Sequence, residues 1–386
     1  MDKFKILAEE VREHVFNQII PFWEGLKDER GGFCGFVGRD LAKDFSAPKG
    51  GILTSRILWF FSNAYMAQKS EKTARLAKHA YEFLRDVFLD KEYGGVYWTV
   101  KDNKPDDDMK HVYCQAFSVY ALASYYRAFG ETEALDLAMA QFNLIEEKGK
   151  DEYGYLEALN RDFSPSDDNE KLSEDGYDAK KTMNTLLHVA EAYTELYLAN
   201  KDGRVKAALA ETLRLTREKV YNPAKGQLEV FFDEKYNPIS DIYSYGHDIE
   251  ASWLIDRAAD ALGDTSFSAL TSLLCNNVLA EAFDGKALYN QKLRGEIDKT
   301  RIWWVQAETI VGALNEYQKN GDEKLLDAAF AVWEFIKKYI IDQKSGEWFW
   351  QTDEFGKPDN EPFVSPWKCP YHNGRMCLEV ISRYGK

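Results

Sequence analysis

Apolar residues recur every three to four positions along most of the chain, which is the period of a helix face. The pattern predicts helices at 4–23, 52–68, 72–88, 113–129, 132–146, 182–198, 204–219, 247–262, 266–282, 303–317, 323–340 and from about 371. These helices come in pairs with short connections, and the first and the last are left to pair with each other.

A second pattern separates the pairs. A charged or Asn-containing turn is followed by a Gly and then by alternating aromatic or apolar residues, which indicates a short hairpin or bend. The pattern occurs at 28–36, 90–98, 151–156, 222–230, 283–289 and 342–350. Its spacing of roughly 60 to 70 residues is typical of a repeat architecture.

Six helix pairs whose ends meet predict an all-α fold, an (α/α)6 barrel or toroid with short β-hairpins in the connecting loops. In each repeat the helix after the hairpin would be the inner one. No linker, low-complexity tract or shift in composition divides the chain. We therefore expect residues 1–386 to form a single catalytic domain.

The expected inner helices carry polar residues near their N-termini. These are Arg56; His111, Tyr113 and Gln115; Asn184 and His188; His247 and Glu250; Trp304, Gln306 and Glu308; His372 and Arg375. In a toroid all six N-terminal ends open at the same mouth. The polar side chains would then converge on one pocket, which is the expected functional site.

Each of these residues also has a purely structural interpretation. His188 follows Asn184 by four positions on the same helix face and could be a hydrogen-bonded core histidine. Arg56 and Glu308 could form a buried ion pair, and one residue of the Trp303–Trp304 pair is expected in the core. Only the shared position in the repeat favours a functional role over these alternatives.

The segment 367–375 concentrates Trp, Lys, Pro, Tyr, His and Arg directly before an apolar run. Pro370 fits at a helix start but not inside a helix, so we expect a helix from about Tyr371. His372 and Arg375 then lie one turn apart on one face. An imidazole and a guanidinium at a helix N-terminus suit a developing oxyanion.

Composition narrows the class of partner. Ten Trp and 22 Tyr favour a sugar site, because C–H-rich pyranose faces pack on aromatic rings. The net charge of −15 argues against nucleic acid or an anionic membrane. No apolar run approaches the roughly 20 residues of a membrane span, and the charged N-terminus lacks a signal-peptide core.

His14 and His79, among charged residues of outer helices, are expected at the surface, whereas His111 stays undecided.

Five scattered cysteines, odd in number and without a CxxC pair, indicate reduced thiols rather than a disulfide framework. Together with the charged N-terminus, they predict a cytoplasmic protein. The sequence gives no sign of a partner chain, and we expect a monomer.

The residue set favours proton transfer. The chain lacks the HxxxH and HxH spacings that are typical of zinc sites. It also lacks a phosphate-binding loop, a dinucleotide fingerprint and a GxSxG motif. Two imidazoles can act as base and acid near neutral pH, and an Arg beside them can stabilise an enediolate oxygen. A glycosidase would need two carboxylates, for which Glu250 and Glu308 are the candidates. A non-catalytic sugar-binding toroid would have no need for both His247 and His372.

The chain resembles the N-acylglucosamine 2-epimerase superfamily over essentially its whole length. The resemblance rests on five motifs in the same order, at 55–59, 182–188, 245–253, 303–308 and 367–375. The similarity is greatest to its branch that acts on β-1,4-linked disaccharides. The resemblance implies an (α/α)6 barrel and epimerisation at C2 of the reducing-end glucose of cellobiose or lactose through a cis-enediolate. It implies no cofactor and no metal. Other branches act on N-acetylglucosamine, or interconvert mannose with fructose or glucose.

The resemblance also implies roles for individual residues. His247 and His372 would be the two acid–base residues, and His188 would assist ring opening and closing. The remaining residues would bind substrate or support the site: Arg56, Tyr113 and Asn184 at O1 and O2, Glu250 beside His247, Trp304 and Trp367 stacked on the sugars, and Glu308. One enediolate can also lead to a ketose, so lactulose from lactose is a further product that the resemblance leaves open.

Overall fold

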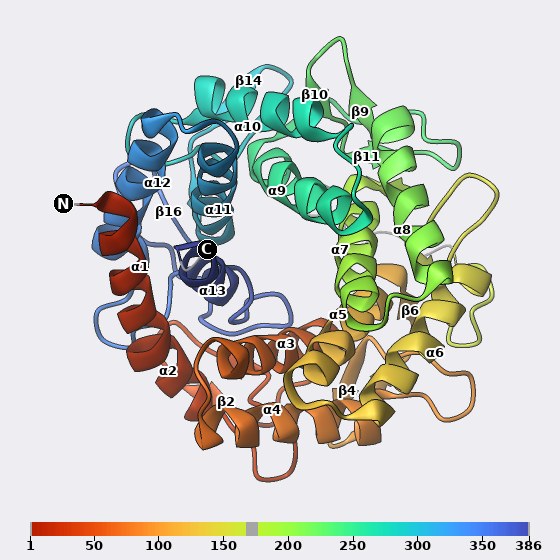
Figure 1. The fold of residues 1–386 in the computed structure, drawn as a ribbon. Coiled ribbons are helices and arrows are strands. Elements are labelled where there is room, and N and C mark those ends of the chain that lie inside the picture. Colours follow the sequence, from red (N-terminus) through yellow and green to blue (C-terminus); the bar gives the residue numbers. More distant parts are fainter. Residues whose placement is uncertain (1, 167–176, 385–386) are drawn as a thin grey trace.

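The computed structural model describes residues 2–166 and 177–384, and they form a closed ring of helices (Figure 1). Six helices line the inside of the ring: α3 (Gly51–Ala67), α5 (Val112–Phe129), α7 (Met183–Asn200), α9 (Tyr245–Leu262), α11 (Trp303–Asn320) and α13 (His372–Tyr384). Each contacts the next in this order, and α13 packs back on α3, which closes the ring. The predicted (α/α)6 barrel is confirmed.

Six outer helices each pack on an inner partner. They are α1 (Lys3–His14), α4 (Glu71–Phe83), α6 (Thr132–Lys148), α8 (Gly203–Leu215), α10 (Ser268–Ala282) and α12 (Glu323–Phe335). Four of them continue into π-helical turns, at Val15–Ile19, Leu84–Phe88, Thr216–Val220 and Ile336–Ile340, and the short α2 (Ile20–Glu24) follows the first of these turns. The pairing of α1 with α13 joins the two chain ends, as the sequence predicted.

Hydrophobic patterning explains which helices are inside. In α5 every residue from Val112 to Tyr125 is buried, so the helix is covered on all sides. The outer helix α4 instead buries one stripe, which includes Leu76, Ala77 and Ala80. A helix that is apolar all round must lie inside, whereas an amphipathic helix can cover it.

The recurrent turn is one structural device used six times. In the second repeat the Asp90 carboxylate accepts hydrogen bonds from the backbone N–H groups of Glu92 and Tyr93. Gly94 and Gly95 then adopt φ values of 75°, which side chains disfavour. The equivalent turns are held in the same way by Asp28, Asp151, Asn222, Asp284 and Asp342. Short-range side-chain hydrogen bonding thus accounts for the pattern in the sequence.

A repeated ion pair, which the sequence did not reveal, joins these turns to the inner helices. The Lys110 ammonium group, just before α5, lies 3.1 Å from the Asp90 carboxylate, and both side chains are fully buried. The corresponding pairs are Lys49–Asp28, Lys181–Asp151 and Arg301–Asp284. Each pair fixes the position at which an inner helix begins.

Two polar residues that we expected in the pocket hold hairpins instead. The Gln115 amide accepts from the backbone N–H of Val96 and donates to its carbonyl. Gln306 makes the same two bonds to Leu288. Both residues lie near the N-terminus of an inner helix, as predicted, but their side chains bind the connecting hairpins.

The strands are short and antiparallel, and one strand directly precedes each of five inner helices. The pairs are β1 (Phe36–Val37) with β2 (Lys43–Asp44), β6 (Lys110–His111) with β7 (Ala158–Leu159), β8 (Lys181–Thr182) with β11 (Phe231–Phe232), β9 (Tyr221–Asn222) with β10 (Gln227–Leu228), and β15 (Arg301–Ile302) with β16 (Gln351–Thr352). Two sheets have three strands, β3 (Lys49–Gly50), β4 (Thr99–Lys101) and β5 (Lys104–Asp107), and β12 (Ile242–Ser244), β13 (Gln291–Leu293) and β14 (Glu296–Asp298). These strands build the mouth of the ring around the N-termini of the inner helices.

The expectation that His14 lies at the surface is wrong. His14 is 4% exposed; its Nδ1 donates to Gln18 at 2.9 Å, and its Nε2 accepts from Trp348 Nε1 at 2.8 Å. The π-helical continuation of α1 brings this face of the helix against the sixth hairpin. His79 is half-buried rather than exposed, and His111 is buried beside Trp98.

All five cysteines are buried and unpaired, as the scattered spacing indicated. Among the described residues, no helix has the length and apolar character needed to cross a membrane.

Candidate active site

A cavity of about 310 Å³ opens at the N-terminal ends of the inner helices. Its lining includes nine of the ten predicted site residues: Arg56, Tyr113, Asn184, His188, His247, Glu250, Trp304, Trp367 and His372. The tenth, Glu308, is buried behind the lining. The lining also contains residues that sequence reasoning missed, among them Ser244, Asn290, Gln291 and Trp350.

The repeat explains why these side chains converge. Tyr113, Asn184 and Trp304 are each the second residue of their helix. The sixth positions of α3, α7, α9 and α11 are occupied by Arg56, His188, Glu250 and Glu308. Residues four apart share a helix face, and closure of the ring turns that face of every inner helix toward the common axis.

All three pocket histidines are held through Nδ1. His188 Nδ1 lies 2.8 Å from Glu191 Oε2, and His372 Nδ1 lies 2.7 Å from Glu308 Oε1. His247 Nδ1 lies 2.7 Å from the Ser244 hydroxyl. A hydrogen bond to one ring nitrogen fixes the orientation and tautomer of the imidazole. In each ring it leaves Nε2 as the nitrogen that can exchange a proton with a ligand.

Burial favours the neutral form of the two proposed acid–base histidines by lowering their pKa values. It lowers the pKa of His247 to about 3. It also lowers the pKa of His372 well below its ordinary value, and the positive charge of Arg375 adds to that effect. A neutral imidazole that donates from Nδ1 to a carboxylate carries a free lone pair on Nε2. His372, whose Nδ1 faces the Glu308 carboxylate, therefore has Nε2 free to accept a proton, whereas the Ser244 hydroxyl can either donate to or accept from Nδ1 of His247.

The partners of Glu250 differ from the expectation that it supports His247. Glu250 contacts Arg375, and its Oε1 lies 3.9 Å from His372 Nδ1. Burial, together with the nearby carboxylate of Glu308, raises the pKa of Glu250 to about 7. The glutamate, with its pKa near 7, therefore lies beside His372, whereas His247 is held by the Ser244 hydroxyl.

Arg375 does not occupy the oxyanion position that the sequence suggested. Its guanidinium is fully buried and contacts the carboxylates of Glu191, Glu250 and Glu308. The cation that faces the pocket is Arg56, whose Nη2 donates to the Tyr113 hydroxyl at 2.8 Å. The two arginines had similar sequence signals, and only the partners brought in by other helices separate them.

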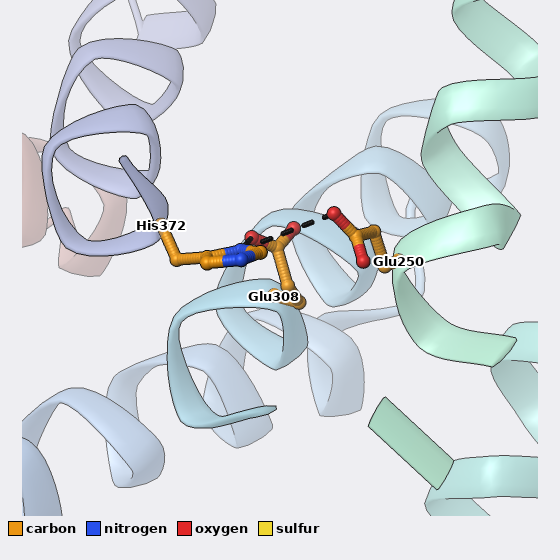
Figure 2. A group of neighbouring side chains, drawn as sticks. All are labelled: Glu250, Glu308 and His372. Carbon is orange, nitrogen blue, oxygen red and sulfur yellow. Dashed lines mark hydrogen bonds and ion pairs between the residues drawn. The ribbon is translucent and has the colours of Figure 1, made fainter. Parts of the chain in front are cut away.

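Glu250, Glu308 and His372 approach closely enough to suggest a metal site (Figure 2). Their ligand atoms lie within 4.8 Å of one another. However, Nη2 of Arg375 contacts both carboxylates and already supplies the positive charge that a metal ion would bring. The arrangement is that of a buried arginine–carboxylate network that orients an imidazole.

Aromatic rings flank the acid–base groups. The Trp304 ring centroid lies 4.8 Å from that of His247 and 5.5 Å from that of His372. Trp367 is also part of the lining, and its ring centroid lies 6.2 Å from that of Tyr113. A ligand on the Trp304 face would thus lie near both imidazoles.

Comparisons with known proteins agree with this geometry. The family model for N-acylglucosamine 2-epimerase matches residues 32–373. A cellobiose 2-epimerase of Ruminococcus albus is 50% identical over 386 residues, which is 98% of this chain and 99% of the relative, and one of Dictyoglomus turgidum is 48% identical with the same coverage. The solved structure of a cellobiose 2-epimerase from Bacillus thermoamylovorans superposes with a TM-score of 0.95 at 44% identity, covering 98% of this chain and all of that one.

Fold, pocket and relatives together define an isomerase that acts on carbohydrates. The ring of six helix pairs places acid–base groups and aromatic faces at one mouth, as a sugar epimerase requires. The chain belongs to the N-acylglucosamine 2-epimerase family.

Proposed function

We propose that the protein epimerises C2 of the reducing-end glucose of β-1,4-linked disaccharides, converting cellobiose to glucosyl-mannose and lactose to epilactose. The observation that carries this proposal is that the rings of His247 and His372 both lie within 5.5 Å of the Trp304 ring on the pocket lining, with Nδ1 of each imidazole already hydrogen-bonded. The cellobiose 2-epimerases that match the full chain support the choice of substrate.

The first step opens the pyranose ring. His188 is held by Glu191 and lines the pocket, so its Nε2 can take the proton from the O1 hydroxyl as the C1–O5 bond breaks. O5 leaves with a proton from a neighbouring donor, and C1 becomes an aldehyde. The reverse transfers close the ring at the end of the reaction.

The second step moves the C2 proton. One of His247 and His372 takes it on Nε2, and the electron pair of the C2–H bond becomes the C1–C2 double bond of a cis-enediolate. The negative charge develops on O1, where Arg56, Tyr113 and Asn184 can bind it. The other histidine, which must enter the step as an imidazolium with a proton on Nε2, donates that proton to the opposite face of C2, which inverts its configuration and restores the aldehyde. The two histidines thereby exchange protonation states, and proton exchange with water resets them before the next turnover. Only protons move, so the steps need no redox cofactor.

Binding would rest on the aromatic residues. Trp304 and Trp367 offer flat apolar faces on the pocket lining, which suit the C–H faces of the two sugars. We propose that residues 1–386 act as one catalytic domain. A cytoplasmic, monomeric enzyme agrees with the unpaired buried thiols and with the family's small-molecule substrates.

The geometry disfavours a glycosidase. An inverting enzyme places its two carboxyl groups about 6.5–9.5 Å apart, with room for a water molecule between them. The nearest oxygens of Glu250 and Glu308 lie within 4.8 Å, and both carboxylates bind the same arginine nitrogen. Glu308 also does not line the pocket. Neither residue can therefore act as an independent acid or base across a glycosidic bond.

The test is proton NMR of the purified protein with cellobiose in D₂O. Deuterium at C2 together with a mannose-ended product is the expected result, whereas release of free glucose would mean hydrolysis and would reject the proposal. His372→Asn should lower turnover by about 10²–10⁴-fold, the usual contribution of a general acid or base, while cellobiose still binds. A His372→Asn protein with full turnover would disprove the assigned role.

A further inference from the structure

We propose that Arg375 is a positioning residue that couples the two histidine–glutamate pairs of the pocket, His188–Glu191 and His372–Glu308. The inference rests on the proposed function, because it assigns ring opening to one pair and C2 proton transfer to the other. Arg375 does not line the sugar pocket and would act only through the two carboxylates.

One side of the guanidinium serves the ring-opening pair. Nη1 of Arg375 contacts Glu191 Oε1 and the Tyr371 hydroxyl. That hydroxyl itself lies 2.7 and 2.6 Å from the two oxygens of Glu191. The other oxygen, Oε2, holds His188 Nδ1 at 2.8 Å. The Arg375–Tyr371 combination therefore fixes the carboxylate that orients His188.

The other side serves the proton-transfer pair. Nη2 of Arg375 lies 2.7 Å from Glu308 Oε1, the same oxygen that holds His372 Nδ1 at 2.7 Å. Nη2 also contacts Glu250, and Trp253 Nε1 donates to the second oxygen of Glu308 at 3.0 Å. Glu308 is thus held by Arg375 at one oxygen and by Trp253 at the other. Its contact with His372 therefore depends on the position of the Arg375 guanidinium.

The planar fork makes the coupling specific. A guanidinium donates from two nitrogens in a fixed plane, whereas a lysine ammonium is a single point charge. The ring of Tyr371 lies 4.3 Å and that of Trp253 4.8 Å from the Arg375 carbon Cζ, so the plane cannot rotate freely. A shift of the guanidinium toward one carboxylate must move it away from the other, and the orientation of the two histidines becomes linked.

A second cavity provides a way to test the idea. It has a volume of about 870 Å³, and its lining includes Arg375, Arg127, Arg257 and Arg383 together with residues at the C-terminal ends of the inner helices. It therefore lies at the end of the barrel opposite the sugar pocket. Arg375 Nε is buried without a hydrogen-bond partner among the described atoms. In Arg375→Ala the space of the lost side chain would join this cavity, so a small cation could enter without passing the sugar pocket.

The first experiment measures cellobiose epimerisation by Arg375→Ala with added guanidinium chloride at non-denaturing concentrations. We expect little turnover without guanidinium, a saturable recovery with it, and no recovery with ammonium chloride. Arg301→Ala is the matched control, a buried arginine paired with Asp284 outside the network, and guanidinium should not raise its turnover. Failure of guanidinium to raise turnover of folded Arg375→Ala would overturn the proposal.

Arg375→Lys keeps the charge and guards against misfolding of the alanine variant. Its kcat should fall by about 100-fold, as small misplacements of catalytic groups cause, and its KM should stay within about twofold because the sugar contacts are intact. A merely structural arginine would leave kcat unchanged, or change KM together with the unfolding temperature. Wild-type turnover in the lysine variant would reject the coupling.

The coupling itself is measured by Glu191→Gln, Glu308→Gln and the double variant. We expect the double variant to lose less turnover than the product of the two single losses, because both disturb one shared guanidinium. The same cycle in the Arg375→Lys background should be multiplicative. Multiplicative losses in the wild-type background would show two independent pairs. Absence of epimerisation by the wild-type protein would instead reject the proposed function.

Discussion

The Nδ1 atom of His372 lies 2.7 Å from Oε1 of Glu308, although Glu308 lies outside the lining of the sugar pocket. A buried carboxylate behind an imidazole fixes its tautomer and stabilises the imidazolium that forms when Nε2 takes a proton. The sequence predicts substrate binding by Glu308; from this contact we instead propose a supporting role for Glu308 behind His372.

Glu308→Gln should lower kcat by about 100-fold, because the imidazolium loses its charged partner, within the range that general acid–base catalysis contributes. KM should change little, since Glu308 does not line the pocket. Steady-state kinetics with cellobiose would measure both constants. The control is Glu316→Gln, a buried glutamate farther along α11 that accepts from Ser272. A raised KM with unchanged kcat in Glu308→Gln would contradict the supporting role.

Titration of Glu250 should make kcat/KM depend on pH near pH 7. Its pKa is raised to about 7 by burial and by Glu308, so the carboxylate is protonated below pH 7 and ionised above it. The negative charge, 3.9 Å from His372 Nδ1, favours proton uptake by His372, and kcat/KM should rise as pH increases through 7. The pH dependence of C2 deuterium exchange tests this. The rise should be absent from Glu250→Gln, and an unchanged rise in that variant would assign it to another group.

His14 should make stability depend on pH in mildly acidic solution. Burial lowers its pKa from 6.5 to about 4, so below pH 6.5 the unfolded chain binds a proton that the folded protein does not. Stability therefore falls as pH decreases from 6.5 to 4, by about 3 kcal/mol for this group alone. Urea unfolding of wild type and His14→Gln at both pH values isolates the effect. An equal pH dependence in the two proteins would show that His14 contributes nothing to it.

The buried ion pair at the second hairpin should matter for stability and not for chemistry. Asp90→Ala leaves the Lys110 ammonium buried without its partner, 3.1 Å away in wild type, and should reduce the free energy of unfolding by about 3–5 kcal/mol. Thermal and urea denaturation measure the loss. Asp106→Ala, on an exposed strand, should change stability by no more than about 0.5 kcal/mol. A similarly small loss in Asp90→Ala would mean that the ion pair does not anchor α5.

The helices could be predicted closely because their signals are local. The expected segment 52–68 corresponds to α3, Gly51–Ala67, and the segment 323–340 to α12 with its π-helical turn. The hairpins could be predicted equally well. An Asp or Asn side chain that accepts hydrogen bonds from backbone N–H groups of its own turn gives a short, recognisable sequence pattern. The buried lysines before the inner helices gave no such signal, because their acidic partners lie about 20 to 30 residues earlier.

The sequence by itself determined the six helix pairs, the common mouth and nine residues of the pocket lining. Eight of the nine follow from helix period and repeat position, and Trp367 follows from the family resemblance. Only the tertiary structure decided which polar side chain faces the sugar and which supports another. His372 and Arg375 share one turn of α13, yet one lines the pocket and the other binds carboxylates from α7, α9 and α11. Closing the ring brings those carboxylates together, and no local pattern records that contact.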